Sequence, residues 1–269
     1  MCVPTSRPFF GRSSASRLQS PVVGQLVNVV VADGVATITL DSPANRNALS
    51  QQLLADFHAA FDAAEQAHAR VIVLTHTAPV FCAGADLKER STGKVDSTSF
   101  VRAMQRLATT SAPVIAAVDG PVRAGGIGLM AACDLVVVNS SITFAFTEVR
   151  IGVAPATITW PILQRCGWSK LAAPYLTGEI FDAATALDMG LVTHVTGDVA
   201  ATTADLCRNT LLGGPNAVAA TKTLLRGAHT IAELQSLSES LFLSDEGQEG
   251  MAAFIEKRPP SWVGQGNRR

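Results

Sequence analysis

The stretch Asp119-Gly-Pro-Val-Arg-Ala-Gly-Gly-Ile-Gly-Leu-Met-Ala-Ala-Cys-Asp134 decides the fold of this chain. The apolar residues 113–118 before it predict a buried strand, and residues 127–133 have helical character. A glycine-rich turn between a strand and a helix presents backbone N–H groups, and the positive end of a helix, to one small volume. Because Gly125 and Gly126 have no Cβ, a ligand can approach their main chain closely. The turn therefore predicts half of an oxyanion hole, and tight strand–helix packing is the alternative interpretation.

A second loop, Phe81-Cys-Ala-Gly-Ala-Asp86, has the same character, since it also follows a predicted strand and precedes a predicted helix. Two backbone N–H groups that converge on one point stabilise a thioester oxygen as it becomes an enolate. The chain contains no GxGxxG, GxxxxGK[ST] or GxSxG motif. Their absence argues against the common nucleotide-binding folds and against an α/β-hydrolase.

The composition excludes several classes of protein. The 269 residues are 48% hydrophobic, and 21 Lys and Arg balance 22 Asp and Glu. Such a balance gives no electrostatic reason to expect a nucleic acid or an anionic membrane as partner, and no apolar run approaches the roughly 20 residues of a membrane-spanning helix. Five scattered cysteines without a CxxC pair indicate a reduced, cytoplasmic setting. The five dispersed histidines show no metal-ligand spacing, so we expect no metal.

Three regions are expected along the chain. Residues 1–24 are rich in Arg, Ser and Pro and lack an acidic residue, so we interpret them as a disordered or non-native extension and exclude them from the fold; a transit peptide is the alternative. Residues 25–195 alternate predicted strands and helices, as an α/β core does. Residues 196–269 are predominantly helical. Apolar helix faces beyond a core often pack on a neighbouring subunit, so an oligomer is expected.

The expected elements follow from hydrophobic periodicity and from the turn residues between them. Strands are expected at 25–31, 35–40, 71–75, 114–118 and 135–138, with weaker signals at 142–146 and 191–195. Helices are expected at 51–67, 100–110, 127–133, 181–190, 199–212, 216–228, 231–242 and 246–257.

Seven short motifs carry a resemblance to a known family. They are Ser42-Pro-Ala-Asn-Arg-Asn-Ala-Leu-Ser50, Phe81-Cys-Ala-Gly-Ala-Asp-Leu-Lys-Glu89, Pro113-Val-Ile-Ala-Ala-Val-Asp-Gly120, Ala131-Ala-Cys-Asp134, Phe146-Thr-Glu-Val-Arg-Ile-Gly152 with Pro155, Leu176-Thr-Gly178, and Glu249-Gly-Met-Ala-Ala-Phe-Ile-Glu-Lys-Arg258. In this order they resemble the crotonase (enoyl-CoA hydratase/isomerase) superfamily over residues 27–263. The resemblance implies a crotonase-like ββα spiral core, a helical C-terminal trimerisation region, and a homotrimer or a hexamer formed from two trimers.

The resemblance also implies the binding residues. The oxyanion hole would be the N–H groups of Ala85 and Gly125, and an acyl-CoA thioester would be the substrate. Coenzyme A would therefore enter as part of the substrate, with no permanently bound cofactor. A family lysine that reaches the nucleotide phosphates from a neighbouring subunit corresponds to Lys257. The other implied coenzyme A contacts are Arg46, Ala83, Ala85, Asp86, Leu87, Lys88 and Gly125, although capping of a helix is the favoured role for Asp86.

Two glutamates flank the substrate double bond in the family's hydratases, the first in a GGGxE pattern. Gly128 stands at that position here, and Glu148 stands at the position of the second. The apolar neighbours of Glu148 predict partial burial and a raised pKa suited to proton transfer; a surface carboxylate is the alternative. The glycine in the first position most resembles branched glutaconyl-CoA hydratases. Arg123 is expected to be solvated or paired rather than bound to substrate, and Cys82 is expected to be structural.

Three functions remain open from the sequence. The first is an acyl-CoA lyase that hydrates a 2-enoyl-CoA, with Glu148 as acid and base. The second keeps the enolate hole but isomerises, decarboxylates or hydrolyses the thioester. The third is a non-catalytic acyl-CoA binder, suggested by the missing glutamate.

Overall fold

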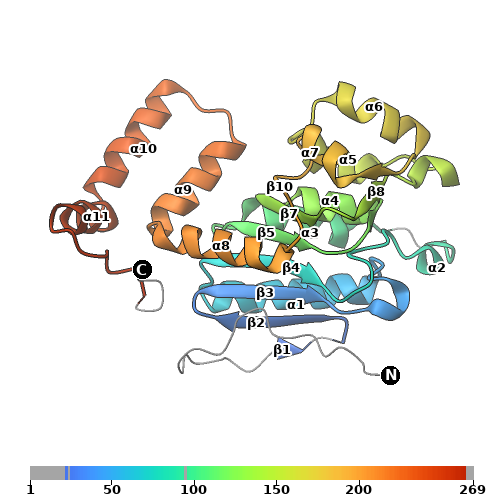
Figure 1. Cartoon of the computed structure of the whole chain (residues 1–269), viewed down its shortest axis with the longest axis horizontal. Coiled ribbons are helices and arrows are strands. Elements are labelled where there is room, and N and C mark those ends of the chain that lie inside the picture. Colours follow the sequence, from blue (N-terminus) through green and yellow to red (C-terminus); the bar gives the residue numbers. More distant parts are fainter. Residues whose placement is uncertain (1–21, 24, 94–95, 265–269) are drawn as a thin grey trace.

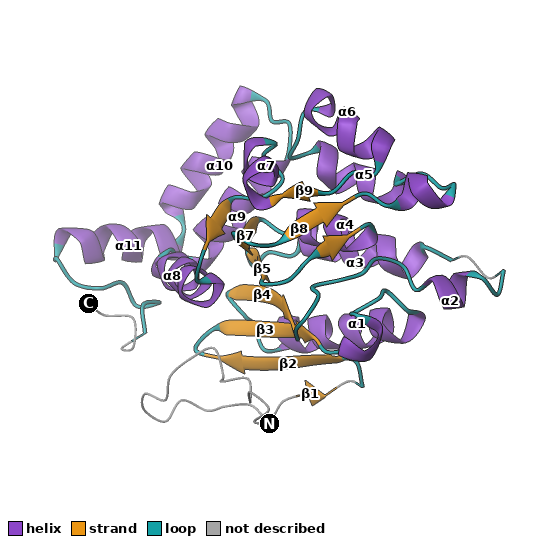
Figure 2. Ribbon diagram, turned by 45° about the vertical axis from the view of Figure 1, so that its right-hand side comes forward, coloured by secondary structure: helices purple, strands orange, loops and turns teal. Residues whose placement is uncertain are grey.

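The computed structural model describes residues 22–23, 25–93 and 96–264. A seven-stranded sheet in the order β1-β2-β3-β4-β5-β7-β10 lies at the centre of these residues (Figure 2). Its strands are β1 Val22–Val23, β2 Val27–Ala32, β3 Val35–Leu40, β4 Val71–His76, β5 Val114–Val118, β7 Leu135–Asn139 and β10 His194–Thr196. The two edge pairs β1–β2 and β2–β3 are antiparallel, and every pair from β3 to β10 is parallel. The predicted α/β class is confirmed.

The amino-terminal hairpin is confirmed, with one correction. Asp33 and Gly34, with φ of 50° and 80°, form the turn between β2 and β3, and such left-handed pairs match the twist of a hairpin. Val22 and Val23 were placed in the excluded extension, but they form β1 against β2. The rest of that extension, residues 1–21 and 24, lies outside the described residues.

Both faces of the parallel sheet are covered by helices. Alternate residues of β4 enter different clusters: Ile72 packs with α1 (Gln51–Gln66) and α3 (Thr98–Thr109), whereas Val73 packs with α8 (Val199–Leu212). Successive strand side chains point to opposite faces, which explains why β4 is a continuous apolar run. The helix α4 (Gly125–Ala131) is entirely buried on the side of α1 and α3.

A three-stranded sheet, β6-β8-β9, lies beside the main one (Figure 2). Its strands are β6 Val122–Arg123, β8 Thr143–Ala145 and β9 Phe181–Asp182. The helix predicted at 181–190 is shorter than expected, since its first two residues form β9 and Asp182 caps α7 by accepting from Thr185 N. The short helices of this region are η1 Pro43–Asn45, α2 Leu87–Arg90, η2 Glu148–Ile151, α5 Ala156–Leu163, α6 Trp168–Thr177 and α7 Ala183–Asp188.

The carboxy-terminal part is helical, as predicted. The helix α8 packs on the sheet, and α9 (Pro215–Arg226), α10 (Ile231–Leu243) and α11 (Asp245–Ile255) extend to one side of the molecule (Figure 1). The large exposed apolar side chains on these three helices are Leu225, Ile231, Leu234, Phe242, Leu243, Met251, Phe254 and Ile255. Within the described part of the chain, no helix has the length and apolar character to span a bilayer.

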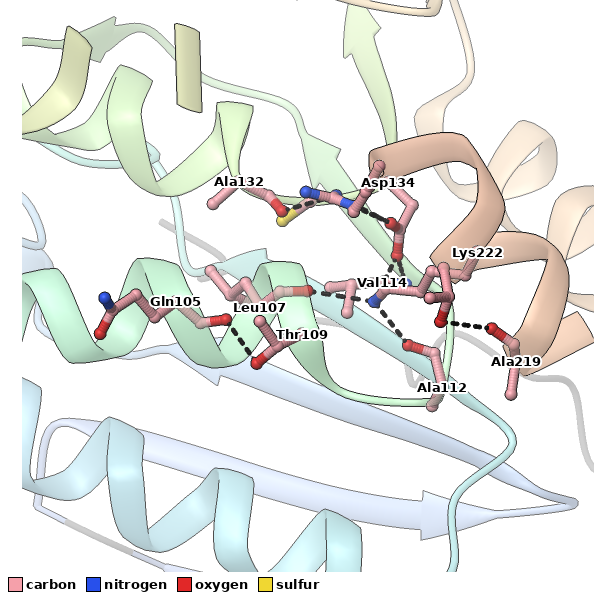
Figure 3. A network of polar contacts seen from close by, with 12 residues as sticks. Gln105, Leu107, Thr109, Ala112, Val114, Ala132, Asp134, Ala219 and Lys222 are labelled. Carbon is pink, nitrogen blue, oxygen red and sulfur yellow. Dashed lines mark hydrogen bonds and ion pairs between the residues drawn. The ribbon is translucent and has the colours of Figure 1, made fainter. Parts of the chain in front are cut away.

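A buried ionic cluster attaches α9 to the core (Figure 3). Lys222, only 6% exposed, lies 2.8 Å from Asp134 and donates to the carbonyls of Leu107 and Ala112, at the end of α3. Arg226 also pairs with Asp134 at 2.8 Å. The carboxylate is thereby shared by two cations, and the cluster fixes the projecting helices to the segment that follows α4.

Candidate active site

The two glycine-containing loops lie against each other. Arg123 N donates to the Cys82 carbonyl at 3.0 Å, so residues 82 and 122 form an isolated parallel bridge. Gly84, at φ +92°, is so close to the other loop that an added Cβ would lie 2.9 Å from the Ala124 Cβ and 3.4 Å from Gly125 N. Only a residue without a Cβ fits there, because both the backbone conformation and the space require it.

A third segment, which follows η1, fixes the loop at 82–86. The Arg46 carbonyl accepts from Ala83 N at 3.0 Å, and Leu49 N donates to the Gly84 carbonyl at 2.8 Å. Asp86 N donates to the Leu49 carbonyl at 3.5 Å. The residue between them, Ala85, makes no backbone donation to any described residue. Its N–H therefore points to a space that the described chain does not fill with an acceptor.

Gly125 presents a second such N–H. It is the first residue of α4, where an N–H has no intrahelical acceptor, and it donates to no described residue. The preceding Ala124 has φ 49° and ψ −122° and donates to the Ala145 carbonyl at 3.0 Å. A non-glycine residue in this region is strained, and such strain concentrates at functional sites. Ala124 thus directs the Gly125 N–H away from the protein's own acceptors.

The predicted pair of donors is close together in space. Ala85 N lies 3.8 Å from the position that a Cβ on Gly125 would occupy. The same position lies 2.9 Å from Leu49 Cδ1 and 3.5 Å from Phe100 Cζ. Leu49 and Phe100 are buried apolar side chains. Two free N–H groups beside an apolar wall can stabilise a developing oxyanion strongly, because the local dielectric constant is low.

Glu148 is the first residue of η2, three residues after the Ala145 carbonyl that binds Ala124. Burial raises the pKa of its carboxyl above the ordinary 4.5, and its backbone N–H partly opposes that shift. The atom Oε2 is buried and has no hydrogen-bond partner among the described residues. The predicted desolvation is therefore confirmed. A carboxyl with a raised pKa and a free oxygen suits proton transfer.

Ile158 of α5 fills the place next to Gly128. A Cβ on Gly128 would lie 2.4 Å from Ile158 Cγ2 and 3.2 Å from Met104 Sδ. A larger side chain cannot occupy position 128 in this arrangement. The sequence gave no indication that Ile158 packs against this glycine.

The remaining predicted residues have varied surroundings. Asp86 caps α2, accepting from Lys88 N at 2.9 Å, as favoured. Leu87 and Lys88 are exposed beside it, and the Arg46 side chain is also exposed. Lys257 follows α11, at the opposite end of the molecule from α2 (Figure 1). Within one chain it does not reach the 82–88 loop.

Arg123 and Cys82 are both engaged in the structure of the protein. Arg123 donates to the Thr143 carbonyl and to the Thr143 hydroxyl, the latter at 2.9 Å. Burial raises the pKa of the Cys82 thiol to about 12, and its sulfur accepts from Gly84 N at 3.4 Å. A neutral, buried thiol is a poor nucleophile, which supports the structural role predicted for it.

Tyr175 of α6 is a residue that sequence reasoning missed. Its ring packs on Phe146 with 4.3 Å between centroids, and its hydroxyl lies close enough to Glu148 to be influenced by that charge. The helix α5 lies between the two residues in the sequence. No spacing rule links them, so only the packing of α6 on η2 reveals the pair.

A strand–turn–helix site with two free backbone donors and a partly buried carboxyl is suited to stabilising an oxyanion. The sequence matches the family described as enoyl-CoA hydratase/isomerase over residues 31–265, and the chain belongs to that family. It is therefore an enzyme of the hydratase-like type with a crotonase fold.

Individual relatives agree with this assignment. The chain is 31% identical to enoyl-CoA hydratase EchA19 of Mycobacterium tuberculosis, covering 84% of this chain and 91% of the relative. An enoyl-CoA hydratase structure from Mycobacterium avium is 40% identical with a TM-score of 0.68, covering 90% of this chain and all of that one. One from Mycobacterium smegmatis is 30% identical with a TM-score of 0.82, covering 88% and 98%.

Proposed function

We propose that the protein adds water to the double bond of a 2-enoyl-CoA thioester. Membership of the enoyl-CoA hydratase/isomerase family supports this reaction type. The observation that carries it is the pair of free N–H groups of Ala85 and Gly125. The carboxyl of Glu148, whose pKa is raised, follows the segment that is hydrogen-bonded to the start of α4.

In this proposal the thioester oxygen accepts from Ala85 and Gly125. Water loses a proton to the Glu148 carboxylate as its oxygen bonds to C3, and the π electrons move toward the thioester to give an enolate. The two N–H groups stabilise that charge. Glu148 then returns the proton to C2, which regenerates the carboxylate. A single acid/base group therefore serves both halves of the reaction.

The coenzyme A portion would bind along the exposed loop at 83–88. Arg46 and Lys88 supply exposed positive charge near it, which suits phosphate groups. Lys257 would add a further charge only from another subunit, because it lies at the far end of its own chain (Figure 1). A homotrimer, or a hexamer of two trimers, would meet that requirement and cover the apolar side chains of α9–α11.

The direct test is hydration of a panel of 2-enoyl-CoA thioesters by the purified protein and by Glu148→Gln. We expect the substitution to lower kcat at least about 100-fold, because it removes the only proposed acid/base group. Unchanged turnover in the variant would refute the role of Glu148, and absence of hydration by the wild-type protein would refute the reaction.

A double-bond isomerase is the second candidate, and the Ile158 side chain beside Gly128 favours it. Shifting a double bond needs one base beside an enolate hole and no water. Analysis of the products formed from 3-enoyl-CoA and 2-enoyl-CoA substrates separates the two reactions. Decarboxylation and thioester hydrolysis would be detected in the same assay, and binding without any turnover would indicate a non-catalytic acyl-CoA binder.

The finer assignments belong to the same proposal. The glycine at 128 supports a branched glutaconyl-CoA as the substrate class, and such a reaction belongs to fatty acid and branched-chain acid metabolism. The four cysteines in the described part of the chain are buried free thiols, which supports a reducing, cytoplasmic location.

A further inference from the structure

Tyr175 is the only tyrosine of the chain. It lies on α6, and its ring packs at 4.3 Å, centroid to centroid, against Phe146, which precedes Glu148 by two residues. The contact holds the phenol ring beside the segment that carries the proposed acid/base group. The ring position is therefore fixed by packing, independently of its hydroxyl.

The hydroxyl of Tyr175 has no hydrogen-bond partner among the described residues, although its oxygen is buried. The Thr159 hydroxyl lies nearby and partly opposes the rise in the Tyr175 pKa, but it donates its own proton to the Pro155 carbonyl at 2.7 Å. Glu148 Oε2 is likewise buried and unpaired. Buried polar atoms in folded proteins are nearly always paired. The two unpaired oxygens belong to the packed segments α6 and η2, and the Glu148 charge contributes to the raised pKa of Tyr175, so one polar ligand can serve both.

The protonation states make the two groups complementary. Burial, with a smaller contribution from the nearby Glu148 charge, raises the pKa of Tyr175 to about 12. The phenol therefore keeps its proton at neutral pH and can donate a hydrogen bond. The Glu148 carboxylate can only accept one. A water molecule satisfies both, because it accepts from the phenol and donates to the carboxylate.

We propose that Tyr175 is a positioning residue that holds the attacking water against Glu148. This inference rests on the proposed hydration. The Tyr175 hydroxyl donates to the water oxygen and keeps its own proton throughout. Glu148 takes one proton from that water while the oxygen bonds to C3, and later returns a proton to C2. In this way a neutral phenol supplies the water contact that a second carboxylate would otherwise make.

Other neighbours are less suited to this role. Ile158 fills the space next to Gly128 with an apolar side chain, and Arg123 is bound to Thr143. Tyr175 is thus the described polar side chain whose hydroxyl is both buried beside Glu148 and unpaired.

The test compares wild-type protein with Tyr175→Phe, which keeps the ring packed on Phe146. We expect kcat for hydration of a 2-enoyl-CoA to fall about 10- to 100-fold, because the water is no longer oriented. The second readout is exchange of the C2 protons of butanoyl-CoA in D₂O, which needs Glu148 and the enolate hole but no attacking water. That exchange rate should stay within about threefold of wild type.

Thr159→Val is the matched control, since it removes a neighbouring hydroxyl and should leave both rates near wild type. A Tyr175→Phe protein that hydrates 2-enoyl-CoA as fast as wild type would overturn the inference. An equal loss of hydration and of C2 proton exchange would also overturn it, because the residue would then act through packing or through Glu148. A thermal unfolding midpoint near that of wild type confirms that Tyr175→Phe is folded. A wild-type protein that exchanges the C2 protons but hydrates no 2-enoyl-CoA would instead overturn the proposed function itself.

Discussion

The Ile158 side chain occupies the space that a side chain on Gly128 would need, with its Cγ2 2.4 Å from an ideal Cβ at that position. Real Cβ atoms do not come so close to another carbon, so helices α4 and α5 can pack in this way only around a glycine. The glycine at 128 is therefore required by the helix contact itself.

Gly128→Ala tests this contact. We expect it to destabilise the protein by about 1–3 kcal/mol, because overpacking outweighs the gain in helix propensity. The free energy of unfolding from urea titration measures the effect. Gly197→Ala is the matched control, since nothing lies within 4 Å of its added Cβ. A Gly128→Ala protein as stable as wild type would contradict the packing.

The acidic side of the pH–rate profile should belong to Glu148. Its carboxylate is the base, and burial raises its pKa above 4.5. Hydration should therefore decline as the pH falls, with a midpoint above pH 4.5.

The raised pKa of Glu148 also has a consequence for stability. A carboxyl with a raised folded pKa favours the folded state below its unfolded pKa, and that contribution is lost as pH rises through the folded pKa. The free energy of unfolding of Glu148→Gln, compared with that of wild type at the same pH, should therefore be more favourable at pH 8 than at pH 4. The reverse order would contradict the raised pKa.

Asp134→Ala should be strongly destabilising. The substitution leaves Lys222 and Arg226 without their shared carboxylate, and breaking a buried pair costs about 3–5 kcal/mol. Chemical denaturation measures the loss. Adding Lys222→Met should restore part of it, because the buried charge is then gone. The exposed pair Lys170–Asp188 supplies the control, since Asp188→Ala should change stability by no more than about 1 kcal/mol.

Cys82 should be unreactive in the native protein. Its side chain is fully buried and its thiol pKa is about 12. Iodoacetamide at pH 8 should modify it only after unfolding, which mass spectrometry of the peptide detects. Cys82→Ala should keep kcat within about threefold of wild type. Rapid native labelling, or loss of turnover in that variant, would point to a catalytic thiol.

Phe254→Asp should weaken self-association. The side chain is 86% exposed on α11 in the single chain, among other apolar residues of the projecting helices. Light scattering after size-exclusion chromatography should show wild-type protein as a trimer or larger and the variant as a smaller species. Ser141→Asp adds the same charge in the exposed turn between β7 and β8, away from these helices, and should leave the mass unchanged. A monomeric wild-type protein would contradict the proposed assembly.

The elements that the sequence predicted best are those with a long periodic signal. The strand at β4 was recognisable because both its faces are buried, and α1 was recognisable from its cap and its apolar stripe. The two-residue strands β6 and β9 were missed, since two residues carry no period. The meeting of the two loops was predicted because both are of the same type, each between a strand and a helix, whereas the choice of Ala85 and Gly125 within them came from the family resemblance.

The rest of the site depends on packing between distant segments. Ile158 and Tyr175 come from α5 and α6, and an apolar or aromatic residue on a helix looks the same in sequence whether it faces the core or a reaction site. Arg123 illustrates the converse. A solvated or paired side chain was predicted for it, but the partner, Thr143, comes from the neighbouring strand β8 and could not be named from the sequence.

The two free N–H groups are oriented by segments that span residues 46 to 145, through the bonds at Arg46, Leu49, Cys82 and Ala145. These contacts are nonlocal, so they form late and together in folding. A partly folded chain therefore has no pocket in which a thioester can be enolised. Catalytic activity becomes a marker of a completed fold, and its recovery during refolding should coincide with the last cooperative step.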